Sequence, residues 1–382
     1  MIPYSTQTID EDDVKAVCEA LKSPLITCGD LVPQFEDEVC AYTKAPFAVA
    51  VNSCTSALHL AMLALGIGEG DKVYVSAISF VASANCARYV GANVEFVDVD
   101  KDTGNLDLDC LESMLCKDEK NHSLPKALVA VHLSGRPLDL DRLYALKERF
   151  NFKLIEDAAH ALGAIYKGHR IGSCEISEIT VLSFHPVKII TTAEGGMCLC
   201  KTDDLAKKVR KLSSHGIEHN KELLFNKYEP MFYYEMQELG FNYRLTELQA
   251  ALGISQLNKI EEFLRLRRKQ AQEYKKLFAN ENNIGLPLAD NEDNISSWHL
   301  YQVRVENRDE IYSNMRKRGI GVQVHYLPIY SHPYYQNTGN YPKLKGAEDF
   351  FAHTLSIPLY PKLNLVNQQL VAATLCSLVD KL

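Results

Sequence analysis

Short apolar runs alternate with helical patterns over the first two-thirds of the chain. Most of the runs are continuously apolar, which is typical of strands covered by helices on both faces. Strands are predicted over 47–51, 72–76, 94–99, 127–133, 152–156, 179–184 and 196–200. Helices are predicted between them, over 55–65, 81–90, 106–115, 138–149 and 203–213. This alternation predicts a three-layer α/β/α domain with a mainly parallel sheet.

The pattern changes after this region. Residues 221–237 are rich in aromatic and charged side chains and are predicted to leave the domain as a flap. The sequence Thr246-Glu-Leu-Gln249 matches a capping box, so a long helix is expected to begin there and run toward Phe278.

A polar stretch over 281–297 is the best boundary in the chain. We expect a large domain over residues 1–250, then a linking helix and a smaller α+β domain over 251–382. In the smaller domain, strands are predicted over 300–305 and 321–326, and a closing helix over 365–380.

Composition excludes several classes of protein. The 382 residues carry a formal charge of −8, whereas a nucleic-acid binder is usually basic, so no nucleic-acid partner is expected. No apolar run reaches the roughly 18 residues that a membrane-spanning helix needs, and no signal peptide is visible at the start. The cysteines number 11 and include no CxxC pair. This usage favours free thiols in a reducing cytoplasm and no metal site.

The segment Asn52-Ser-Cys-Thr-Ser-Ala-Leu58 joins a predicted strand to a predicted helix. A helix N-terminus exposes unpaired N–H groups and a partial positive charge, which suits a phosphate. Thr55 and Ser56 would add hydroxyl donors. An ordinary helix cap is the commoner use of such residues and stays open.

The segment Leu154-Ile-Glu-Asp157-Ala-Ala-His160 places a carboxylate at the end of a buried strand. Ligands of open α/β sheets bind at this edge. Asp157 could therefore hold magnesium, a ribose or a protonated ring nitrogen, or it could simply cap the next helix.

Lys188 follows the strand that ends near Ser183, and it is flanked by Val187 and Ile189. Most other lysines lie in charged helical runs, as expected of solvated faces. An apolar setting lowers the pKa of an ammonium group, and an amine must be neutral to attack a carbonyl. Lys188 is therefore a candidate for a Schiff base, although a lysine extending out of an apolar turn would look the same.

One cofactor accounts for all three segments. Pyridoxal phosphate needs a lysine for its aldehyde, a carboxylate for its ring nitrogen, and hydroxyls at a helix N-terminus for its phosphate. An aromatic residue over the ring face is also wanted. Phe80 lies at a strand-to-helix turn and could supply it, or it could be an ordinary core residue.

These segments resemble the sugar aminotransferases of the DegT/DnrJ/EryC1/StrS family, within the fold-type I group of pyridoxal-phosphate enzymes. The resemblance extends from Tyr4 to Pro358. The sequences that carry it are NSCTSALHLA, IEDAAHALGA, SFHPVK followed by TTAEGG, LSSHG and GFNYRL. It implies an aspartate-aminotransferase-like large domain and a smaller C-terminal α+β domain.

The resemblance implies a role for each matching residue around the cofactor ring. Lys188 would form the Schiff base, Asp157 would pair with the ring nitrogen, Phe80 would stack on the ring and His160 would face the ring hydroxyl. The residues implied to hold the phosphate are Thr55, Ser56, Ser183 and, from a second subunit, Asn242. A homodimer with a shared active site follows from the last of these.

A finer resemblance, to the pseudaminic-acid branch of the family, is carried by 183–188, 239–244 and 319–330. Those enzymes aminate C4 of a UDP-linked 4-keto-6-deoxy-N-acetylhexosamine, with L-glutamate as donor. His185 and His325 would then line the sugar or donor pocket, and Tyr4 lies near the loops that would select the substrate.

Because the sequence differs from this branch at two places, other keto nucleotide sugars stay open as substrates. Ile189 replaces the proline that this branch usually has, and 23–28 lacks a lysine that some relatives use for the nucleotide. Pyridoxal-phosphate sugar dehydratases of the family have histidine in place of the lysine, so Lys188 favours transamination. A non-catalytic sensor would usually lack the lysine or the acid, and both are present here.

Overall fold

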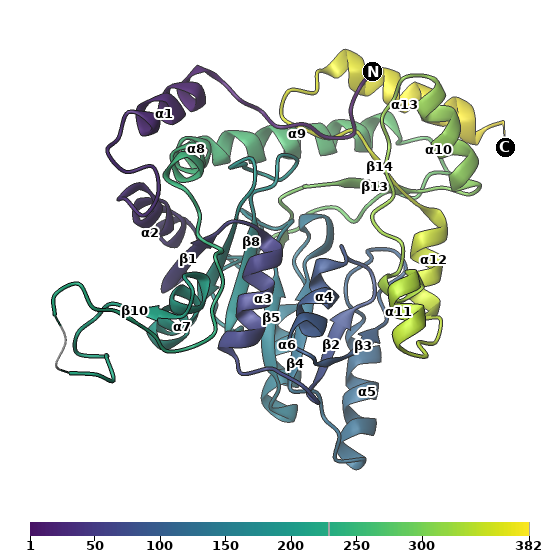
Figure 1. The fold of residues 1–382 in the computed structure, drawn as a ribbon. Coiled ribbons are helices and arrows are strands. Elements are labelled where there is room, and N and C mark those ends of the chain that lie inside the picture. Colours follow the sequence, from purple (N-terminus) through teal and green to yellow (C-terminus); the bar gives the residue numbers. More distant parts are fainter. Residues whose placement is uncertain (228–229, 382) are drawn as a thin grey trace.

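The centre of the molecule is a seven-stranded sheet (Figure 1) in a computed structural model that describes residues 1–227 and 230–381. The strand order is β1-β9-β8-β5-β4-β2-β3. The five strands from β8 to β3 run parallel, and β9 is antiparallel to both β8 and β1. The mainly parallel sheet is therefore confirmed. Its strands are β1 (Phe47–Val51), β2 (Lys72–Ser76), β3 (Asn93–Val97), β4 (Ala127–Val131), β5 (Lys153–Asp157), β8 (Ile179–Ser183) and β9 (Gly196–Cys200).

Helices cover both faces of the sheet, which confirms the three-layer architecture. Helices α3, α4 and α7 pack on one face, around a core that includes Leu58 and Val209. On the other face, α5 and α6 cover the β2–β5 side, and α2 and α8 cover β1, β8 and β9. The bounds are α2 (Leu31–Thr43), α3 (Cys54–Ala64), α4 (Ala82–Tyr89), α5 (Leu108–Lys120), α6 (Leu140–Phe150), α7 (Asp203–Ser213) and α8 (Glu247–Leu257).

The helix predicted to run from Thr246 toward Phe278 is two helices, so the single helix was wrong. The capping box is present: Thr246 accepts a hydrogen bond from the Gln249 backbone N–H, and the Gln249 side chain accepts one from that of Thr246. Helix α8 ends at Leu257 and α9 (Ile260–Leu277) begins three residues later. At the break, the Lys259 ammonium bonds to acidic residues of the α1 (Glu11–Leu21) region.

A second, smaller body packs around its own core, which takes side chains from α9, β13, β14, α10 and α13. Of the two strands expected there, the first is β13, whereas 321–326 forms only a single bridge, between Gln323 and Ser356. Helix α9 contributes to this core with Tyr274 and to the large body with Phe263. The elements of this body are β13 (Tyr301–Arg304), α10 (Arg308–Lys317), β14 (Thr354–Ile357) and α13 (Leu365–Val379). Between them in the chain, η2 (Ile329–Ser331), α11 (Pro333–Thr338) and α12 (Lys345–His353) pack on the core of the large body, through Ile329, Tyr335 and Phe350.

Short elements complete the large body. Strand β12 returns from the polar segment after α9 to pair with β6, which places that segment against the large body. The bounds are η1 (Leu133–Gly135), β6 (Ile165–Tyr166), β7 (His169–Arg170) and β12 (Asn294–Ile295).

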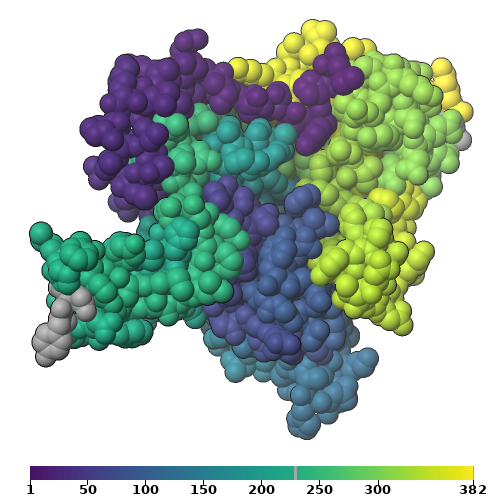
Figure 2. Space-filling model, in the orientation of Figure 1, coloured from purple at the N-terminus to yellow at the C-terminus, as the bar shows by residue number. Residues whose placement is uncertain are grey.

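The predicted flap is a hairpin between β10 (Ile217–Glu218) and β11 (Glu235–Met236) that stands away from the body, in teal in Figures 1 and 2. Its apolar side chains are open to solvent in the single chain: Phe225 is 77% exposed and Phe232 is 82% exposed. An apolar surface of this kind usually marks a contact with another molecule.

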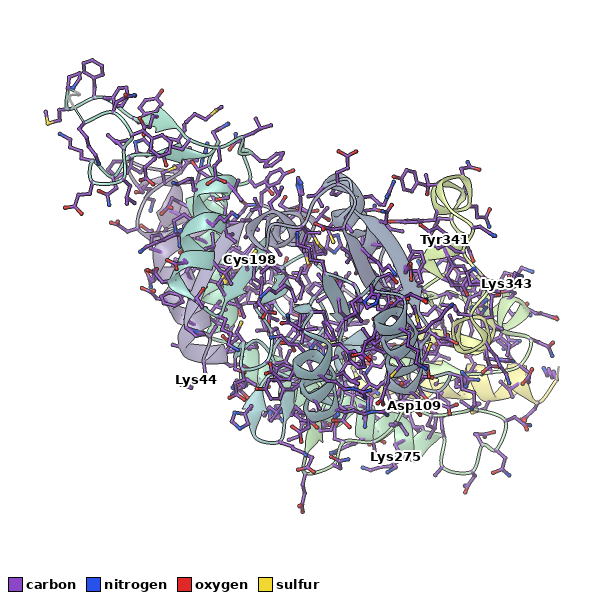
Figure 3. All side chains as sticks on the ribbon, turned by 90° about the horizontal axis from the view of Figure 1, so that it is seen from below. Lys44, Asp109, Cys198, Lys275, Tyr341 and Lys343 are labelled. Atoms are coloured by element: carbon purple, nitrogen blue, oxygen red, sulfur yellow. The ribbon has the colours of Figure 1, made fainter. Side chains whose placement is uncertain are left out.

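All 11 cysteines are free thiols. Cys198 lies deep among packed side chains (Figure 3), where its thiol donates to the Ala57 carbonyl at 3.3 Å. None of the helices in the described part of the chain is long and apolar enough to cross a membrane. The same residues contain no group of three or more potential metal ligands.

Candidate active site

A cavity of about 470 Å³ opens where β4, β5 and β8 end. This is the edge at which parallel strands of α/β proteins present their ligands. Segments of the small body close it from the other side, through His325 and Tyr326. The cavity brings together nine of the residues predicted from the sequence: Tyr4, Thr55, Phe80, Asp157, His160, Ser183, His185, Lys188 and His325.

Lys188 enters this cavity from the turn that follows β8, where its backbone N–H donates to the His185 carbonyl at 2.9 Å. Burial lowers the pKa of the Lys188 amine to about 8, and the nearby Asp157 carboxylate opposes that shift. A larger share of the amine is therefore neutral near pH 8 than for an exposed lysine, and only the neutral form is a nucleophile.

Asp157, the last residue of β5, is held rigidly in the same cavity and is 4% exposed. The Ser83 hydroxyl donates to one carboxylate oxygen at 2.6 Å, and the Ala159 backbone N–H donates to the other at 3.1 Å. The Ser79 hydroxyl oxygen lies 2.7 Å from that of Ser83, so a second hydroxyl is hydrogen-bonded to the first. A carboxylate fixed in this way can pair with a protonated ring nitrogen without moving.

The N-terminus of α3 forms the third wall of the cavity. Ser53 caps the helix by accepting from the Ser56 N–H. The backbone N–H groups of Cys54 and Thr55, and the hydroxyls of Thr55 and Ser183, make no hydrogen bond with any residue that the structure describes. Residues that line the cavity therefore offer four free donors, which suits a phosphate.

Two predicted residues lie outside the cavity. The Ser56 hydroxyl donates to the Asn52 side chain at 2.7 Å and lies 2.9 Å from the Ser53 hydroxyl, so it supports the loop. Asn242 is exposed, and its backbone pairs with Ser214 beside the hairpin. It does not line the cavity of its own chain.

Histidines and aromatic residues form the wall of the cavity on the side of the small body. Burial lowers the pKa of His160 well below its ordinary range and that of His325 to about 3, so both rings are neutral at pH 7. The His325 ring lies 5.4 Å from the Tyr4 ring. Phe80 is 57% exposed, with its ring 6.3 Å from that of Tyr326.

Sequence reasoning did not single out Ser53, Ser83, Tyr326 or Glu194. Ser53 could have been found, because serine one residue before a helix is a cap signal. No local signal marks Ser83 or Tyr326, since each meets its partner only through the fold.

Residues 7–376 match the model of the DegT/DnrJ/EryC1/StrS aminotransferase family. The chain belongs to this family. The resemblance noted in the sequence is thereby confirmed, and so is the activity class of a pyridoxal-phosphate-dependent nucleotide-sugar aminotransferase.

Individual relatives are similar to this chain over nearly its whole length. The chain is 38% identical to the UDP-4-amino-4,6-dideoxy-N-acetyl-beta-L-altrosamine transaminase of Campylobacter jejuni, over 100% of this chain and 98% of that protein. The spore coat polysaccharide biosynthesis protein SpsC of Bacillus subtilis is 36% identical over 95% of this chain and 93% of its own.

Solved structures of family members have the same fold. PseC of Helicobacter pylori, an aminotransferase of pseudaminic acid biosynthesis, superimposes with a TM-score of 0.91 at 31% identity over 100% of both chains. Spr1654 of Streptococcus pneumoniae in its PLP form gives 0.89 at 30% identity, over 100% of this chain and 99% of that one.

The residues of this DegT-family aminotransferase fit the cofactor that the family implies. The free donors at the α3 N-terminus suit its phosphate, and the fixed Asp157 carboxylate suits its ring nitrogen. At position 196 the backbone of Ser53 comes so close that a Cβ atom would lie 2.4 Å from the Ser53 carbonyl carbon. Gly196 therefore allows the N-terminus of α3, which carries the free backbone donors, to lie directly against β9.

Proposed function

We propose that this aminotransferase moves an amino group from L-glutamate to C4 of a UDP-linked 4-keto-6-deoxy-N-acetylhexosamine. The observation that carries the proposal is the Lys188 amine beside the fixed Asp157 carboxylate in one cavity. The Campylobacter jejuni relative supports this substrate, since its name describes a 4-amino-4,6-dideoxy sugar on UDP.

Pyridoxal phosphate, when bound, supplies an electron sink for the carbon that loses its proton. Lys188 would then act as general base and general acid: it would take the proton from the amino-bearing carbon of glutamate and deliver it to the cofactor's aldehyde carbon. In the second half-reaction it would move a proton from that carbon to C4 of the sugar. Asp157 keeps a proton on the ring nitrogen. Thr55 and Ser183 would hold the phosphate. This fixes the position of the cofactor relative to the Lys188 amine in both half-reactions.

Because one cavity serves both substrates, the amino donor must leave before the keto sugar enters. Ping-pong kinetics are therefore expected. We place the reaction in the cytoplasm, since a reducing compartment suits an enzyme whose 11 cysteines are all free thiols.

The decisive experiment incubates purified enzyme with L-glutamate and a panel of keto nucleotide sugars, and reads the products by mass spectrometry. We expect an amino sugar from the UDP-linked 4-keto-6-deoxy-N-acetylhexosamine, and none from Lys188→Arg, because arginine can neither form the covalent link nor shuttle the proton. A water-loss product would favour a dehydratase. An amino sugar from a different keto sugar only would reassign the substrate.

We further propose that the active unit is a homodimer with a shared site. Among the described residues that line the cavity, Lys188 is the only lysine or arginine, whereas the cofactor, glutamate and a UDP-sugar are all anionic. Asn242 is exposed on its own chain and cannot serve the cavity from there. The hairpin also exposes apolar side chains such as Phe225 and Phe232, which a second copy would cover.

Mixed dimers test this arrangement. In a symmetric dimer, the Lys188→Ala and Asn242→Asp changes fall in the same site of a mixed pair, which leaves the other site intact. Two inactive variants are coexpressed with different tags, and the mixed dimer isolated through both tags should then have about one half of wild-type activity, since one of its two sites is intact. No recovery, or a monomer in analytical ultracentrifugation, would refute the shared site while leaving the chemistry of Lys188 untouched.

A further inference from the structure

Both ring nitrogens of His160 are engaged, and their partners fix where its proton lies. The Ser134 backbone N–H donates to His160 Nδ1 at 3.1 Å, so this nitrogen carries a lone pair. In a neutral imidazole the proton must then be on Nε2, which lies 3.2 Å from the Tyr326 hydroxyl oxygen. His160 therefore donates to Tyr326.

The donor to His160 is held by a junction between the two bodies. Ser134 adopts a left-handed conformation with φ 59°, and its carbonyl accepts from the His299 backbone N–H at 3.0 Å. The Ser297 hydroxyl donates to the His160 carbonyl at 2.6 Å, from the same stretch of the small body. Gly135 is required beside it, because a Cβ there would lie 2.0 Å from the Ser297 oxygen.

The surroundings keep His160 neutral. The His299 ring lies 4.3 Å from that of His160, and its Nδ1 is buried with no partner among the described residues. Among the described residues, no carboxylate is hydrogen-bonded to His160, whose two ring nitrogens are bonded to Ser134 and Tyr326. Burial keeps the pKa values of His160 and His299 well below their ordinary range.

We propose that Tyr326 is a further active-site residue, which His160 and Ser134 orient so that its O–H donates into the cavity to an oxygen of cofactor or substrate. Since His160 fills one lone pair of the hydroxyl, the hydroxyl proton is free for a ligand. Tyr326 bonds to no other described residue through its oxygen and lines the cavity beside Phe80. His160 and Ser134 are positioning residues in this scheme, which rests on the proposed aminotransferase function.

The tautomer of His160 is measured first, in wild-type holoenzyme with ¹⁵N-labelled histidine. Long-range ¹H–¹⁵N correlation spectra separate the two neutral tautomers, and His160→Gln identifies the signal among the twelve histidines. We expect the Nε2–H pattern between pH 6 and 9. A proton on Nδ1, or a charged ring in that range, would overturn the proposal whatever the substrate is.

Tyr326→Phe then identifies the acceptor. If the hydroxyl donates to the ring oxygen of the cofactor, the midpoint of the pH titration of the visible absorption band should rise by about one unit. If it donates to a substrate, that midpoint stays and one half-reaction slows about tenfold in stopped-flow measurements. These measurements mix glutamate with enzyme that holds the aldehyde form of the cofactor, or keto sugar with enzyme that holds the amine form. The titration and the glutamate half-reaction test the role of Tyr326 even if the proposed sugar substrate is wrong.

Tyr330→Phe is the matched control. Its hydroxyl donates to Glu348 at 2.9 Å and accepts from the Leu344 N–H at 3.2 Å, outside the cavity. This variant should leave the titration and both half-reactions unchanged. Changes of less than twofold in all measurements for Tyr326→Phe would refute the role of Tyr326, and a misfolded variant would leave the tautomer measurement to decide.

Discussion

The amine of Lys188 combines two properties that rarely occur together, an apolar setting and a neighbouring carboxylate. Burial lowers its pKa to about 8, whereas the exposed Lys22 has its pKa raised by a hydrogen bond and charge from Glu19. At pH 8 about half of the Lys188 amines are therefore neutral, compared with well under a hundredth for an unperturbed lysine.

Competitive acetylation of the enzyme without cofactor should therefore label Lys188 with a half-maximal rate near pH 8, read by peptide mass spectrometry. Lys22 should reach its half-maximum only above the ordinary lysine range. Asp157→Asn should move the Lys188 midpoint further down, because the carboxylate opposes the effect of burial. A midpoint shared with Lys22 would contradict the assignment.

Single residues differ in how far the sequence can predict their place. Lys188 and Asp157 could be found because each follows an apolar strand, and strand ends of a parallel sheet meet at one edge. Tyr326 could not, since its partner His160 is 166 positions away and no periodic pattern links them. Reactive residue types at strand ends can be identified from the sequence, whereas contacts between distant loops cannot.

At the scale of elements, local pattern predicted the strands well and the helix ends less well. Strands β1, β2 and β9 have the predicted bounds because continuous apolar runs end sharply at polar residues. The break between α8 and α9 was missed, since it coincides with bonds from Lys259 to Asp10 and Asp13. Those partners are about 250 positions away, beyond any local pattern.

The contact between β9 and the α3 N-terminus gives a prediction at this scale. A Cβ at position 196 would lie 2.4 Å from the Ser53 carbonyl carbon and 2.5 Å from the Cys54 nitrogen, both backbone atoms that cannot rotate away. Gly196→Ala should therefore cost about 1–3 kcal/mol of unfolding free energy, measured in urea. It should also weaken phosphate-dependent cofactor binding, because the displaced helix end carries the donors.

Gly68→Ala is the control for this experiment. Its nearest atom would be the Val90 carbonyl oxygen at 4.0 Å, and its backbone does not require glycine. This variant should keep wild-type stability and cofactor affinity. Equal stability losses in both variants would show that the approach of β9 to α3 is not the cause.

At the scale of the whole molecule, the active site depends on how the two bodies join. The first residues cross to the small body, where the Gly321 N–H donates to the Ile2 carbonyl at 2.7 Å and the Leu359 N–H donates to that of Tyr4 at 3.0 Å. A second connection between the bodies is the hydrogen bond from the His299 N–H to the Ser134 carbonyl. Three buried histidines, His160, His299 and His325, therefore lie where the bodies meet.

Acidification should destabilise this junction, because protonating its buried histidines favours the unfolded chain. The pKa values of all three histidines are lowered by burial, to about 3 for His325, whereas in the unfolded chain they return to about 6.5. Below pH 6.5 the unfolded state binds more protons, so stability is lost as pH falls, by about 1.4 kcal/mol per pH unit and histidine. Buried carboxylates such as Glu156, whose pKa is lowered by its bond to His132 despite burial, act only below about pH 4.5.

Urea unfolding at pH 7 and pH 5 separates these effects. The His325→Asn variant lacks one histidine that must stay neutral in the folded state. The unfolding free energy of this variant should therefore fall by about 2 kcal/mol less between pH 7 and pH 5 than that of the wild type. His122→Asn changes an exposed histidine in a left-handed turn that asparagine also tolerates, and should lose as much as the wild type. If His325→Asn is as acid-sensitive as His122→Asn, the histidines do not set the stability of the junction, and acid must act through other groups.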